Sequence, residues 1–479
     1  MNRNRRNFLK LAGLSGIGLY GSCNFKGTNS AGTNSQDYSL DNIREESLKS
    51  YTQIFNMSGY AAPKLDKVRV GIVGLGGRGS HAVTRLSYIE GVEIKGLCDL
   101  LPERVEEAKK LIKTPGHSPD IYTSKDEAWM EMCRREDIDL IYIATPWSLH
   151  APMAIFSMEN GKHVALEIPA ATTVEEAWEL VQTSEKTKKH CVMLENCCYD
   201  YFELLTLNLA RNGFFGNIVH CEGAYIHEIG ESLFHRGNKN ERWRLKQNIA
   251  RNGNLYPTHG LGPVAQILNI NRGNRMDYMV STSTKDFMMN DFAKELTETD
   301  DYYKQFVDVS YRGNMNTSTI TTVSGQTIMI QHDVTTPRPY SRIHLVSGTK
   351  ATAQKYPLPA RIAIGHNDWL PEAEFKKLEE KFNPPIITKM RDLALKIGGH
   401  GGMDFLMDWR LIDCLRNGLP VDIDVYDAAS WSVIGPLSEW SVANRSASID
   451  IPDFTLGAWK KNIPHDISLV NGGNTGVQI

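Results

Sequence analysis

The segment Tyr256–His259 places two residues suited to proton transfer three positions apart. Histidine ordinarily titrates near neutral pH, and a tyrosine hydroxyl can give or take a proton over one hydrogen bond. Pro257 restricts the backbone between them, and Gly260 and Gly262 permit a tight loop or a helix start. We expect Tyr256 and His259 to act as acid and base, in either order. The alternative is a histidine that caps the following helix.

A second stretch, residues 71–79, reads GIVGLGGRG directly after an apolar run rich in valine. Gly74, Gly76 and Gly79 fit the pattern G-x-G-x-x-G. The first glycine allows a tight turn, the second lets backbone approach a pyrophosphate, and the third permits close packing of helix on strand. With a strand before it and a helix after it, the pattern predicts a dinucleotide site. The alternative is a glycine-rich turn in an α/β domain without a ligand.

An acidic residue lies at the distance that such a site requires. Asp99 ends a second apolar run and follows Gly79 by roughly 20 residues, where the acceptor for the ribose diol belongs. A carboxylate there favours NAD over NADP, because it repels a 2′-phosphate. Arg78 could contact phosphate, ribose or the adenine face. The predicted cofactor is therefore NAD.

Strands and helices alternate through the first half of the chain. Strands are expected at 67–74, 92–100, 139–146, 163–169 and 190–196, with helices at 103–112, 126–136 and 174–189 among them. This alternation predicts a doubly wound parallel sheet, whose ligands bind at the carboxyl ends of the strands. Those ends carry Asp99, Thr145, Pro146, Trp147, His150, Glu167 and Asn196. Trp147 and His150 are expected to line the nicotinamide ribose; a helix-start residue or a packed aromatic is the alternative for each.

The second half has a different pattern. Strand-like text at 216–227, 276–287, 317–336 and 342–354 indicates a large, open, mainly antiparallel sheet. Helices are expected at 201–213, 263–270, 402–418 and 427–445. The fold class is therefore α/β, with an N-terminal Rossmann domain and a C-terminal α+β domain. We divide the chain into a signal (1–30), an extension (31–64), an NAD-binding domain (65–196), a substrate and dimerisation domain (197–448) and a tail (449–479).

The N-terminus resembles a twin-arginine export signal. Asn4 to Lys10 reads NRRNFLK, and the apolar run that follows is too short to span a bilayer. Cys23, after Gly21-Ser22, is a possible lipidation site, although Tyr20 fits such a site poorly. We expect the protein to be exported, and to be either periplasmic or a membrane-anchored lipoprotein. An ordinary basic amphipathic terminus is the alternative.

Composition excludes several classes of partner and site. The net charge of -3 over 479 residues gives no basic patch for nucleic acid. The 8 cysteines include no C-x-x-C pair, so buried free thiols are expected rather than disulfides or zinc. Cys197 and Cys198 are adjacent, and on a strand their side chains would point to opposite faces. No metal site is predicted.

Glu167-Ile168-Pro169 at the end of a Rossmann strand resembles the Gfo/Idh/MocA oxidoreductase superfamily. The likeness covers nearly all of the chain after about residue 65. Many members have Glu-Lys-Pro here, with the lysine assisting proton removal. Ile168 replaces that lysine and cannot do acid or base work. The substitution counts against an ordinary sugar or inositol dehydrogenase.

Later motifs resemble glycoside hydrolase family 109, NAD-dependent glycosidases acting on α-N-acetylgalactosaminides. They are ENCCYDY, GAYIHE, RWRLKQNIARNGNLYPTHGLGPV, TTPRPYSR and GHGGMDF. The resemblance implies NAD contacts at Gly77, Arg78, Asp99, Trp147, Ser148, Leu149, His150, Glu167, Ile168 and Asn196. It implies sugar contacts at Tyr225, Arg244, Tyr256, Pro257, Thr258, His259 and Tyr340. Without the family, Arg244 could equally form a surface ion pair, and Tyr225 and Tyr340 could be core residues. His400, in GHGG, could reach the site.

The family implies a redox-neutral route, which we adopt as a hypothesis. The sugar is oxidised at C3, loses its C2 proton and its glycosidic oxygen, adds water and is reduced again. Net redox change is zero, so an exported protein could keep one tightly bound, recycled NAD. The rival hypotheses are a net sugar dehydrogenase and a non-catalytic sugar-binding protein. The aglycone and exact sugar stay open, and a homodimer rests on fold analogy alone.

Overall fold

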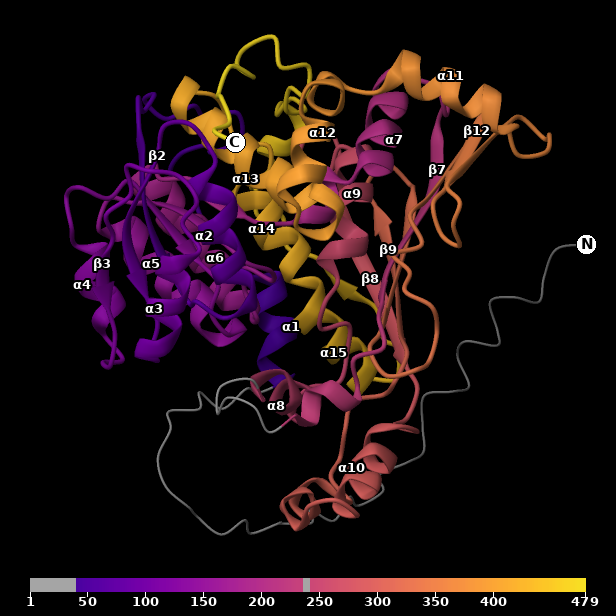
Figure 1. Ribbon diagram of the computed structural model, residues 1–479. Helices are drawn as coiled ribbons and strands as arrows, with labels where there is room; N and C mark the ends of the chain where they lie inside the picture. The colour runs from indigo at the N-terminus through magenta and orange to yellow at the C-terminus, as the bar shows by residue number, and fades with distance from the viewer. Residues whose placement is uncertain (1–39, 236–241) are drawn as a thin grey trace, which may run out of the picture. The chain divides into compact units, whose positions relative to one another are not determined.

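The computed structural model describes residues 40–235 and 242–479. The predicted export signal, with Cys23, lies outside these residues. Two sheets, with helices between and around them, make up the described chain (Figure 1). The two predicted architectures, a Rossmann sheet and a mainly antiparallel sheet, are both confirmed.

The first sheet is parallel throughout, with strand order β3-β2-β1-β4-β5-β6. Its strands are β1 (Val68–Val73), β2 (Val92–Cys98), β3 (Asp120–Tyr122), β4 (Leu140–Ile143), β5 (His163–Leu166) and β6 (Cys191–Met193). Every residue of the central strands β4 and β5 is buried, as expected of a parallel sheet covered on both faces. The chain reverses its direction of winding between β1 and β4, and the carboxyl ends of these strands form the edge where ligands bind.

Five helices connect these strands. They are α2 (Gly77–Ser87), α3 (Pro102–Lys110), α4 (Ala128–Cys133), α5 (His150–Glu159) and α6 (Val174–Thr187). Helix α6 begins with a capping box, in which Thr173 accepts from the Glu176 backbone amide and Glu176 accepts from the Thr173 amide. Helix α4 is shorter than the 126–136 expected from sequence. The order of elements gives the alternation that the sequence predicted.

The second sheet has the strand order β13-β12-β11-β7-β10-β9-β8-β14. Its strands are β7 (Ile218–Ile226), β8 (Met276–Ser283), β9 (Asn316–Thr322), β10 (Thr327–Asp333), β11 (Leu345–Gly348), β12 (Ala351–Gln354), β13 (Arg361–Ile364) and β14 (Ile449–Asp450). Only β7 and β10 pair in parallel; the other neighbours are antiparallel. Strand β14 belongs to the segment expected to be a tail, so that segment begins as an edge strand.

The remaining helices of the described chain are α1 (Leu40–Leu48), α7 (Tyr201–Arg211), α8 (Trp243–Ala250), α9 (Thr258–Ile267), α10 (Met289–Thr297), α11 (Glu372–Phe382), α12 (Pro385–Ile397), α13 (Met403–Asn417), α14 (Val425–Ser432) and α15 (Ile434–Ala443). None of the described helices is long and apolar enough to cross a membrane. The single helix expected at 427–445 is in fact α14 followed by α15. Pro436 lies in the first turn of α15, where its missing backbone N–H breaks no hydrogen bond.

Helices α13 to α15 connect the two sheets. Helix α13 packs on α2, α14 on α6 and β6, and α15 on β8 (Figure 1). The final residues then return to the Rossmann domain, where the Gln478 amide donates to the Tyr88 carbonyl at 2.8 Å. Helix α13 thereby places residues distant in the sequence beside α2, which begins at the ligand-binding edge of the first sheet.

Candidate active site

The glycine-rich turn has the close packing that its sequence predicted. Gly74 has φ of 85°, and a Cβ there would lie 2.5 Å from the Ala144 carbonyl oxygen. A Cβ on Gly79 would lie 1.8 Å from the Gly74 carbonyl oxygen. Gly77, by contrast, has no atom within 4 Å of such a Cβ, so the backbone at the start of α2 is open to a ligand. These residues form a cradle for a dinucleotide pyrophosphate at a helix N-terminus.

A cavity of about 650 Å³ lies along this edge of the sheet. The predicted cofactor residues in its wall are Gly74, Gly76, Gly77, Arg78, Asp99, Trp147, Leu149, His150, Glu167 and Ile168. Three others lie elsewhere: Gly79 is packed under the turn, Ser148 is exposed, and Asn196 is buried behind the cavity. Trp243, Arg244 and Tyr256 close the cavity from the second domain. The cavity therefore runs from the dinucleotide turn to the predicted sugar residues.

Asp99 lies at one end of this cavity. Its Oδ2 accepts from the Leu75 amide at 2.7 Å, and its Oδ1 accepts from the Leu101 amide at 3.0 Å. The Arg104 guanidinium lies 3.9 Å from the same carboxylate. Asp99 is thus fixed beside the glycine turn, where the sequence placed the acceptor for a ribose diol.

His150 is held by two carbonyl oxygens. Its Nδ1 lies 2.7 Å from the Pro169 oxygen and its Nε2 lies 2.8 Å from the Thr145 oxygen. Burial lowers the pKa of His150, although both carbonyls act in the opposite direction. The ring therefore braces the ends of β4 and β5 and presents carbon atoms to the cavity.

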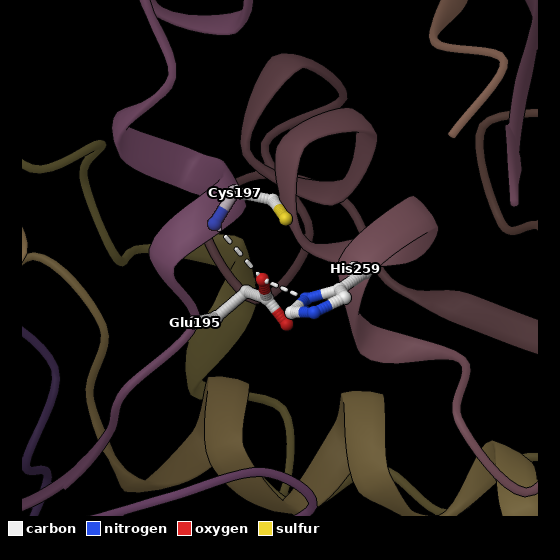
Figure 2. A group of neighbouring side chains, drawn as sticks. All are labelled: Glu195, Cys197 and His259. Atoms are coloured by element: carbon white, nitrogen blue, oxygen red, sulfur yellow. Dashed lines mark hydrogen bonds and ion pairs between the residues drawn. The ribbon is translucent and has the colours of Figure 1, made fainter. Parts of the chain in front are cut away.

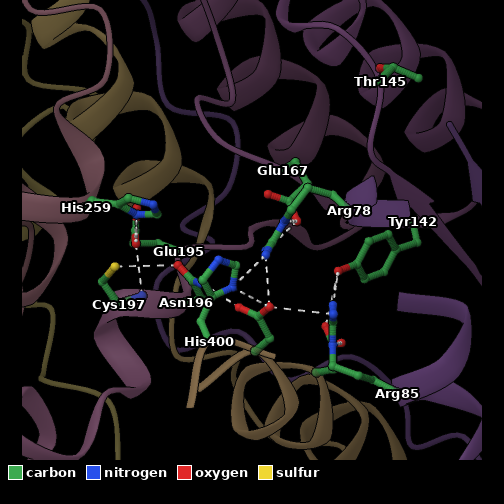
Figure 3. Close-up of polar contacts among 12 residues, drawn as sticks. Arg78, Arg85, Tyr142, Thr145, Glu167, Glu195, Asn196, Cys197, His259 and His400 are labelled. Atoms are coloured by element: carbon green, nitrogen blue, oxygen red, sulfur yellow. Dashed lines mark hydrogen bonds and ion pairs between the residues drawn. The ribbon is translucent and has the colours of Figure 1, made fainter. Parts of the chain in front are cut away.

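Arg78 is the centre of a polar network between α2 and α13 (Figure 3). Its Nε donates to Glu167 Oε1 at 2.7 Å, and its Nη1 donates to Asp404 Oδ2 at 2.9 Å. His400 Nδ1 lies 2.9 Å from the same Asp404 oxygen, and the Asn196 amide donates to Asp404 Oδ1. The GHGG segment thus reaches the site. The Arg78 side chain is held along the cavity wall by two carboxylates.

Electrostatics keep Asp404 ionised. Burial alone would raise the pKa of Asp404, but His400, Arg78 and Arg85 hold it well below its usual range. Asp408, one turn further along α13, is also fully buried and pairs with Arg85 at 2.7 Å. Burial raises the pKa of Asp408 to about 6 despite that partner. Asp404, which faces Arg78, therefore stays ionised to lower pH than Asp408.

His259 is paired with a glutamate that the sequence analysis did not single out (Figure 2). His259 Nδ1 donates to Glu195 Oε1 at 2.7 Å, and the Cys197 amide donates to the same oxygen at 3.0 Å. Glu195 is completely buried; burial alone would raise its pKa, but the facing imidazole outweighs this and lowers it. An ionised Glu195 places the proton of a neutral imidazole on Nδ1 and leaves His259 Nε2 able to accept a proton.

The same pair lies near a thiol. One ligand atom each of Glu195, Cys197 and His259 lies within 4.8 Å of the others. Burial holds the pKa of Cys197 well above its usual range, so the sulfur is a neutral thiol and donates to Asn196 Oδ1 at 3.5 Å. A thiolate is the form that binds metals, and we therefore interpret the group as a hydrogen-bonded dyad with a neighbouring thiol.

Cys197 and Cys198 lie in the single-turn helix η3 (Asn196–Tyr199), so the expectation that they alternate along a strand is wrong. The reason is local: the Glu195 carboxylate accepts from the Cys197 amide and starts a helical turn where the apolar run ends. The seven cysteines within the described residues are buried free thiols, as predicted.

An aromatic cluster joins His259 to the cavity. The Tyr256 ring lies 5.0 Å from the His259 ring, 4.6 Å from Tyr225 and 5.8 Å from Trp147. The Arg244 guanidinium lies over the rings of Tyr256 and Trp147, at 5.6 and 5.9 Å. Burial raises the pKa of Tyr256 well above its usual range, although Arg244 opposes the shift. Tyr256 is therefore a protonated hydroxyl at neutral pH.

The other predicted sugar residues flank this cluster. Pro257 and Thr258 begin α9 and place His259 in its first turn. Tyr340 is 38% exposed and lies 6.4 Å from Tyr225, ring to ring. Its hydroxyl accepts from Arg342 at 3.2 Å. Tyr256 and Arg244 reach the large cavity, whereas His259 and Tyr340 lie beside it.

Sequence reasoning missed Glu195, Asp404 and Trp243. Glu195 immediately precedes Asn196 at the end of β6, where the rule of carboxyl strand ends applies. Asp404 follows His400 by four residues, a spacing at which two side chains at a helix start can meet. Trp243 adjoins Arg244 and carries no separate signal. The first two were therefore accessible to pattern reasoning.

Two family models match the chain. "Oxidoreductase family, NAD-binding Rossmann fold" matches residues 68–195. "Glycosyl hydrolase 109, C-terminal domain" matches residues 199–461. The boundary between them falls at η3, beside the Glu195–His259 pair. The dyad is thus assembled from both matched regions.

Curated relatives cover most of the chain. An alpha-N-acetylgalactosaminidase of Bacteroides fragilis is 50% identical over 410 residues, which is 84% of this chain and 95% of the relative. A glycosyl hydrolase family 109 protein of Shewanella pealeana is 44% identical over 472 residues, 97% of this chain and 99% of the relative.

Solved structures share the fold at low identity. An oxidoreductase domain protein from Kribbella flavida aligns with a TM-score of 0.61 at 17% identity, over 81% of this chain and 100% of the other. Scyllo-inositol dehydrogenase from Lactobacillus casei with bound NAD(H) and scyllo-inositol aligns with a TM-score of 0.56 at 14% identity, over 80% and 99%. These likenesses establish the fold alone.

Proposed function

The chain belongs to glycosyl hydrolase family 109, and we propose that it hydrolyses α-N-acetylgalactosaminides by a redox-neutral, NAD-dependent route. The observation that carries the proposal is the Glu195–His259 dyad beside a dinucleotide cavity, joined to it by Tyr256. Elimination next to a ketone requires a proton acceptor held in one tautomer. That acceptor must lie beside the site that takes the hydride.

The described residues fit NAD. The turn at Gly74 and Gly79 leaves no room for a Cβ, and Gly77 leaves open space for phosphate. Asp99 would hold the ribose diol of the adenosine half, and Trp147, Leu149 and Ile168 would bound the nicotinamide half. When bound, NAD supplies a reversible hydride acceptor for C3 of the sugar. We propose that it stays tightly bound and is regenerated in each turnover.

His259 is the base in this proposal. A C3 ketone makes the C2 proton acidic, and His259 Nε2 takes that proton while Nδ1 stays on Glu195. The ionised Glu195 stabilises the resulting imidazolium. After water has added at C1, His259 returns to C2 a proton that has exchanged with solvent. The protons balance, because His259 takes one from C2 and gives one back.

Tyr256 is the acid. Its raised pKa keeps the hydroxyl protonated until charge develops on a nearby oxygen. We assign it to the leaving glycosidic oxygen, to which it gives its proton; it then takes one from the attacking water. The Arg244 charge, which lowers the pKa of Tyr256 against burial, stabilises the transient tyrosinate. Ile168 stands where related dehydrogenases have a lysine, which disfavours net oxidation as the alternative.

One experiment separates the proposal from a net dehydrogenase. Purified protein without added cofactor is assayed with 4-nitrophenyl α-N-acetylgalactosaminide in deuterated water, and its bound nucleotide is extracted. We expect nitrophenol release, deuterium at C2 of the product and no net NADH. Accumulation of NADH from added NAD⁺ and free sugar, with no bound nucleotide, would instead establish a dehydrogenase. Release from other glycosides alone would keep the route and change the sugar.

We further propose that the protein is exported by the twin-arginine route and is periplasmic or lipid-anchored through Cys23. The support is the NRRNFLK motif with its short apolar run. Replacing Arg5 and Arg6 with lysine should retain the protein in the cytoplasm, as fractionation would show. Labelling with a fatty-acid analogue, lost in Cys23→Ala, tests the anchor.

We also propose a homodimer formed through the open face of the second sheet. Tyr278 on β8 is 41% exposed and alternates with the buried Met279, so it lies on this open face. Light scattering of the purified protein should give twice the mass of the chain. A monomeric mass, with full activity, would contradict this part of the proposal.

A further inference from the structure

The Asp404 carboxylate receives hydrogen bonds from three separate parts of the chain. Arg78, at the start of α2, donates to its Oδ2 at 2.9 Å, and His400 Nδ1 lies 2.9 Å from the same oxygen. The Asn196 amide donates to its Oδ1. Figure 3 shows Arg78, Asn196 and His400 turned toward one another. Asp404 is 2% exposed and belongs to the region matched by the hydrolase model, whereas Arg78 belongs to the Rossmann region.

Arg78 connects this carboxylate to the cofactor cavity. It follows Gly77, where the backbone is open to phosphate, and its side chain lies in the cavity wall. A free arginine side chain has many rotamers, and a ligand that contacts it must bear the cost of ordering it. Glu167 and Asp404 together hold one rotamer of Arg78. Asp404 therefore orders a wall of the dinucleotide site from outside the Rossmann domain.

A second ion pair lies deeper between the same two helices. Arg85 on α2 donates to Asp408 on α13 at 2.7 Å, and both side chains are at most 3% exposed. Neither residue lines the cavity. This deeper pair joins α2 to α13 without reaching the ligand-binding edge. The two layers therefore separate helix packing, which involves Asp408, from the orientation of Arg78, which involves Asp404.

The chain just before α13 is shaped around the Asp404 side chain. All residues from Gly398 to Gly402 have positive φ, between 48° and 98°, and we call these residues the glycine segment. A Cβ on Gly399 would lie 2.7 Å from the Asp404 Cβ and 2.9 Å from its Oδ2. A Cβ on Gly398 would have no atom within 4 Å. Contact with Asp404 thus requires glycine at position 399 but not at position 398.

The glycine segment places His400 on the solvent side of the outer ion pair. The His400 side chain is 58% exposed, and its Nδ1 lies 3.3 Å from Arg78 Nη1. The Tyr201 hydroxyl donates to the Gly401 carbonyl at 3.0 Å, which holds the segment from its other side. His400 and the segment therefore lie over Arg78, and Asp404 is the residue that bonds to both.

We propose that Asp404 is a positioning residue that keeps NAD bound between turnovers. It holds Arg78 and Asn196 in place for the dinucleotide, and through His400 it holds the glycine segment over Arg78, so the cofactor leaves slowly. A buried, charge-assisted contact of this kind acts mainly on the rate of dissociation. The inference rests on NAD as the cofactor of the proposed function, but it concerns release of the cofactor and not the chemistry of the sugar.

The test measures release of NADH from the full-length protein without any sugar. The protein is loaded with NADH by exchange, and excess NAD⁺ then displaces it. Energy transfer from tryptophan to NADH reports the bound fraction, since Trp147 and Trp243 line the cavity. We expect Asp404→Asn to release NADH at least about 10-fold faster than wild type, because the amide has no charge to hold Arg78. Equal rates in the two proteins would overturn the proposal.

Two glycine variants separate contact with Asp404 from backbone strain. Gly398 and Gly399 have φ of 92° and 87° and ψ of -160° and 97°, and neither conformation suits a residue with a Cβ. Alanine at 399 must displace the Asp404 carboxylate, whereas alanine at 398 meets open space. We expect faster release from Gly399→Ala and the wild-type rate from Gly398→Ala. An equal effect of the two alanines would overturn the link between the glycine segment and Asp404.

Asp408→Asn controls for an effect on folding. It weakens the deeper ion pair, so the thermal midpoint should fall, while NADH release from the folded protein should match wild type. Faster release from Asp408→Asn, to the same extent as from Asp404→Asn, would show that helix packing alone retains the cofactor, and would overturn the proposal.

Turnover separates this inference from the proposed function. With 4-nitrophenyl α-N-acetylgalactosaminide, Asp404→Asn should lose activity on dilution and regain it when NAD⁺ is added, whereas the wild type should need no added NAD⁺. Failure of added NAD⁺ to restore Asp404→Asn would overturn the assignment of Asp404 to cofactor retention. Absence of turnover in the wild type, with the differences in NADH release intact, would overturn only the hydrolytic function.

Discussion

Two buried glutamates on neighbouring short helices have opposite roles. Glu195 starts η3 and Glu203 lies in the first turn of α7, and each is at most 2% exposed. Both have a lowered pKa despite burial. They differ in how completely their oxygens are paired.

Glu203 is paired on both oxygens. Arg342 donates to Oε1 at 2.7 Å and Lys355 donates to Oε2 at 2.8 Å. Burial alone would raise the pKa of Glu203, but Lys355 and Arg342 hold it well below its usual range. Two cations and two carboxylates, Asp200 included, leave this cluster neutral and closed. This cluster of charged side chains connects α7 to the second sheet.

Glu195 is paired on one oxygen only, and its partner is a titratable ring. His259 occupies Oε1, while Oε2 is buried without a hydrogen bond in the described chain. The His259 side chain remains 14% exposed on its far side. The comparison shows that a buried carboxylate becomes part of a reactive site when its partner can exchange a proton with a ligand. A buried carboxylate whose partners are permanent cations, as in the Glu203 cluster, is structural.

The sharpest test of the comparison removes the ring. His259→Ala should lower kcat by about 10²–10⁴-fold, because the C2 proton loses its acceptor. Bound NAD and the thermal midpoint should stay close to wild type. Turnover with the nitrophenyl substrate and extraction of nucleotide measure the two effects. Loss of cofactor or of folding would show that His259 is structural, like the Glu203 cluster.

Glu203→Gln should have the reverse effect, lowering stability and leaving activity unchanged. It leaves Arg342 and Lys355 buried with too little negative charge, which costs about 3–5 kcal/mol of unfolding free energy. The activity of the folded fraction should be unchanged. Urea unfolding measures the loss, with Glu222→Gln on the partly exposed side of β7 as the control. A stable but inactive variant would place Glu203 in the catalytic machinery.

Glu195→Gln tests whether the carboxylate positions the base. A glutamine can accept from His259 Nδ1 but cannot stabilise the imidazolium, so kcat should fall about 10–100-fold, as for histidines that lose a carboxylate partner. KM should change little, since Glu195 does not line the cavity. Steady-state kinetics of the wild type and Glu195→Gln give kcat and KM separately and test this expectation. An effect on KM alone would mean that Glu195 shapes the sugar site.

The pH dependence of stability gives the smallest effect. The folded pKa of Glu203 is lower than its unfolded value of about 4.3, so the unfolded state binds more protons as pH falls through that range. The unfolding free energy should therefore decline below about pH 5, by at most about 1.4 kcal/mol per pH unit for this group. Glu203→Gln should flatten that part of the curve. An identical slope in both proteins would contradict the assignment.

Buried histidines contribute at higher pH. Burial lowers the pKa of His190 and of His344 to about 4. Their unfolded pKa is about 6.5, so the unfolded state binds the additional protons between these values, and stability declines as pH falls from about 6.5. Unfolding curves at pH 7, 5.5 and 4.5 should separate this decline from the later one due to Glu203.

The sequence by itself determined the dinucleotide half. A turn in which Gly74 has positive φ and Gly79 contacts its backbone can be read from three glycines, because the constraint is local. Asp99 and Glu167 could be placed because parallel strands end at one edge. The proximity of Tyr256 and His259 followed from their spacing at a helix start.

Only the tertiary structure decided which partners these residues have. Glu195 and His259 are 64 positions apart, and Arg78 and Asp404 are 326 apart. No periodicity links them, since each pair depends on how helices α9 and α13 pack across domains. Asp404 likewise has partners from α2, η3 and the glycine segment. Backbone conformation is encoded over a few residues, whereas a shared proton or a buried carboxylate with partners from several elements depends on the packing of the whole fold.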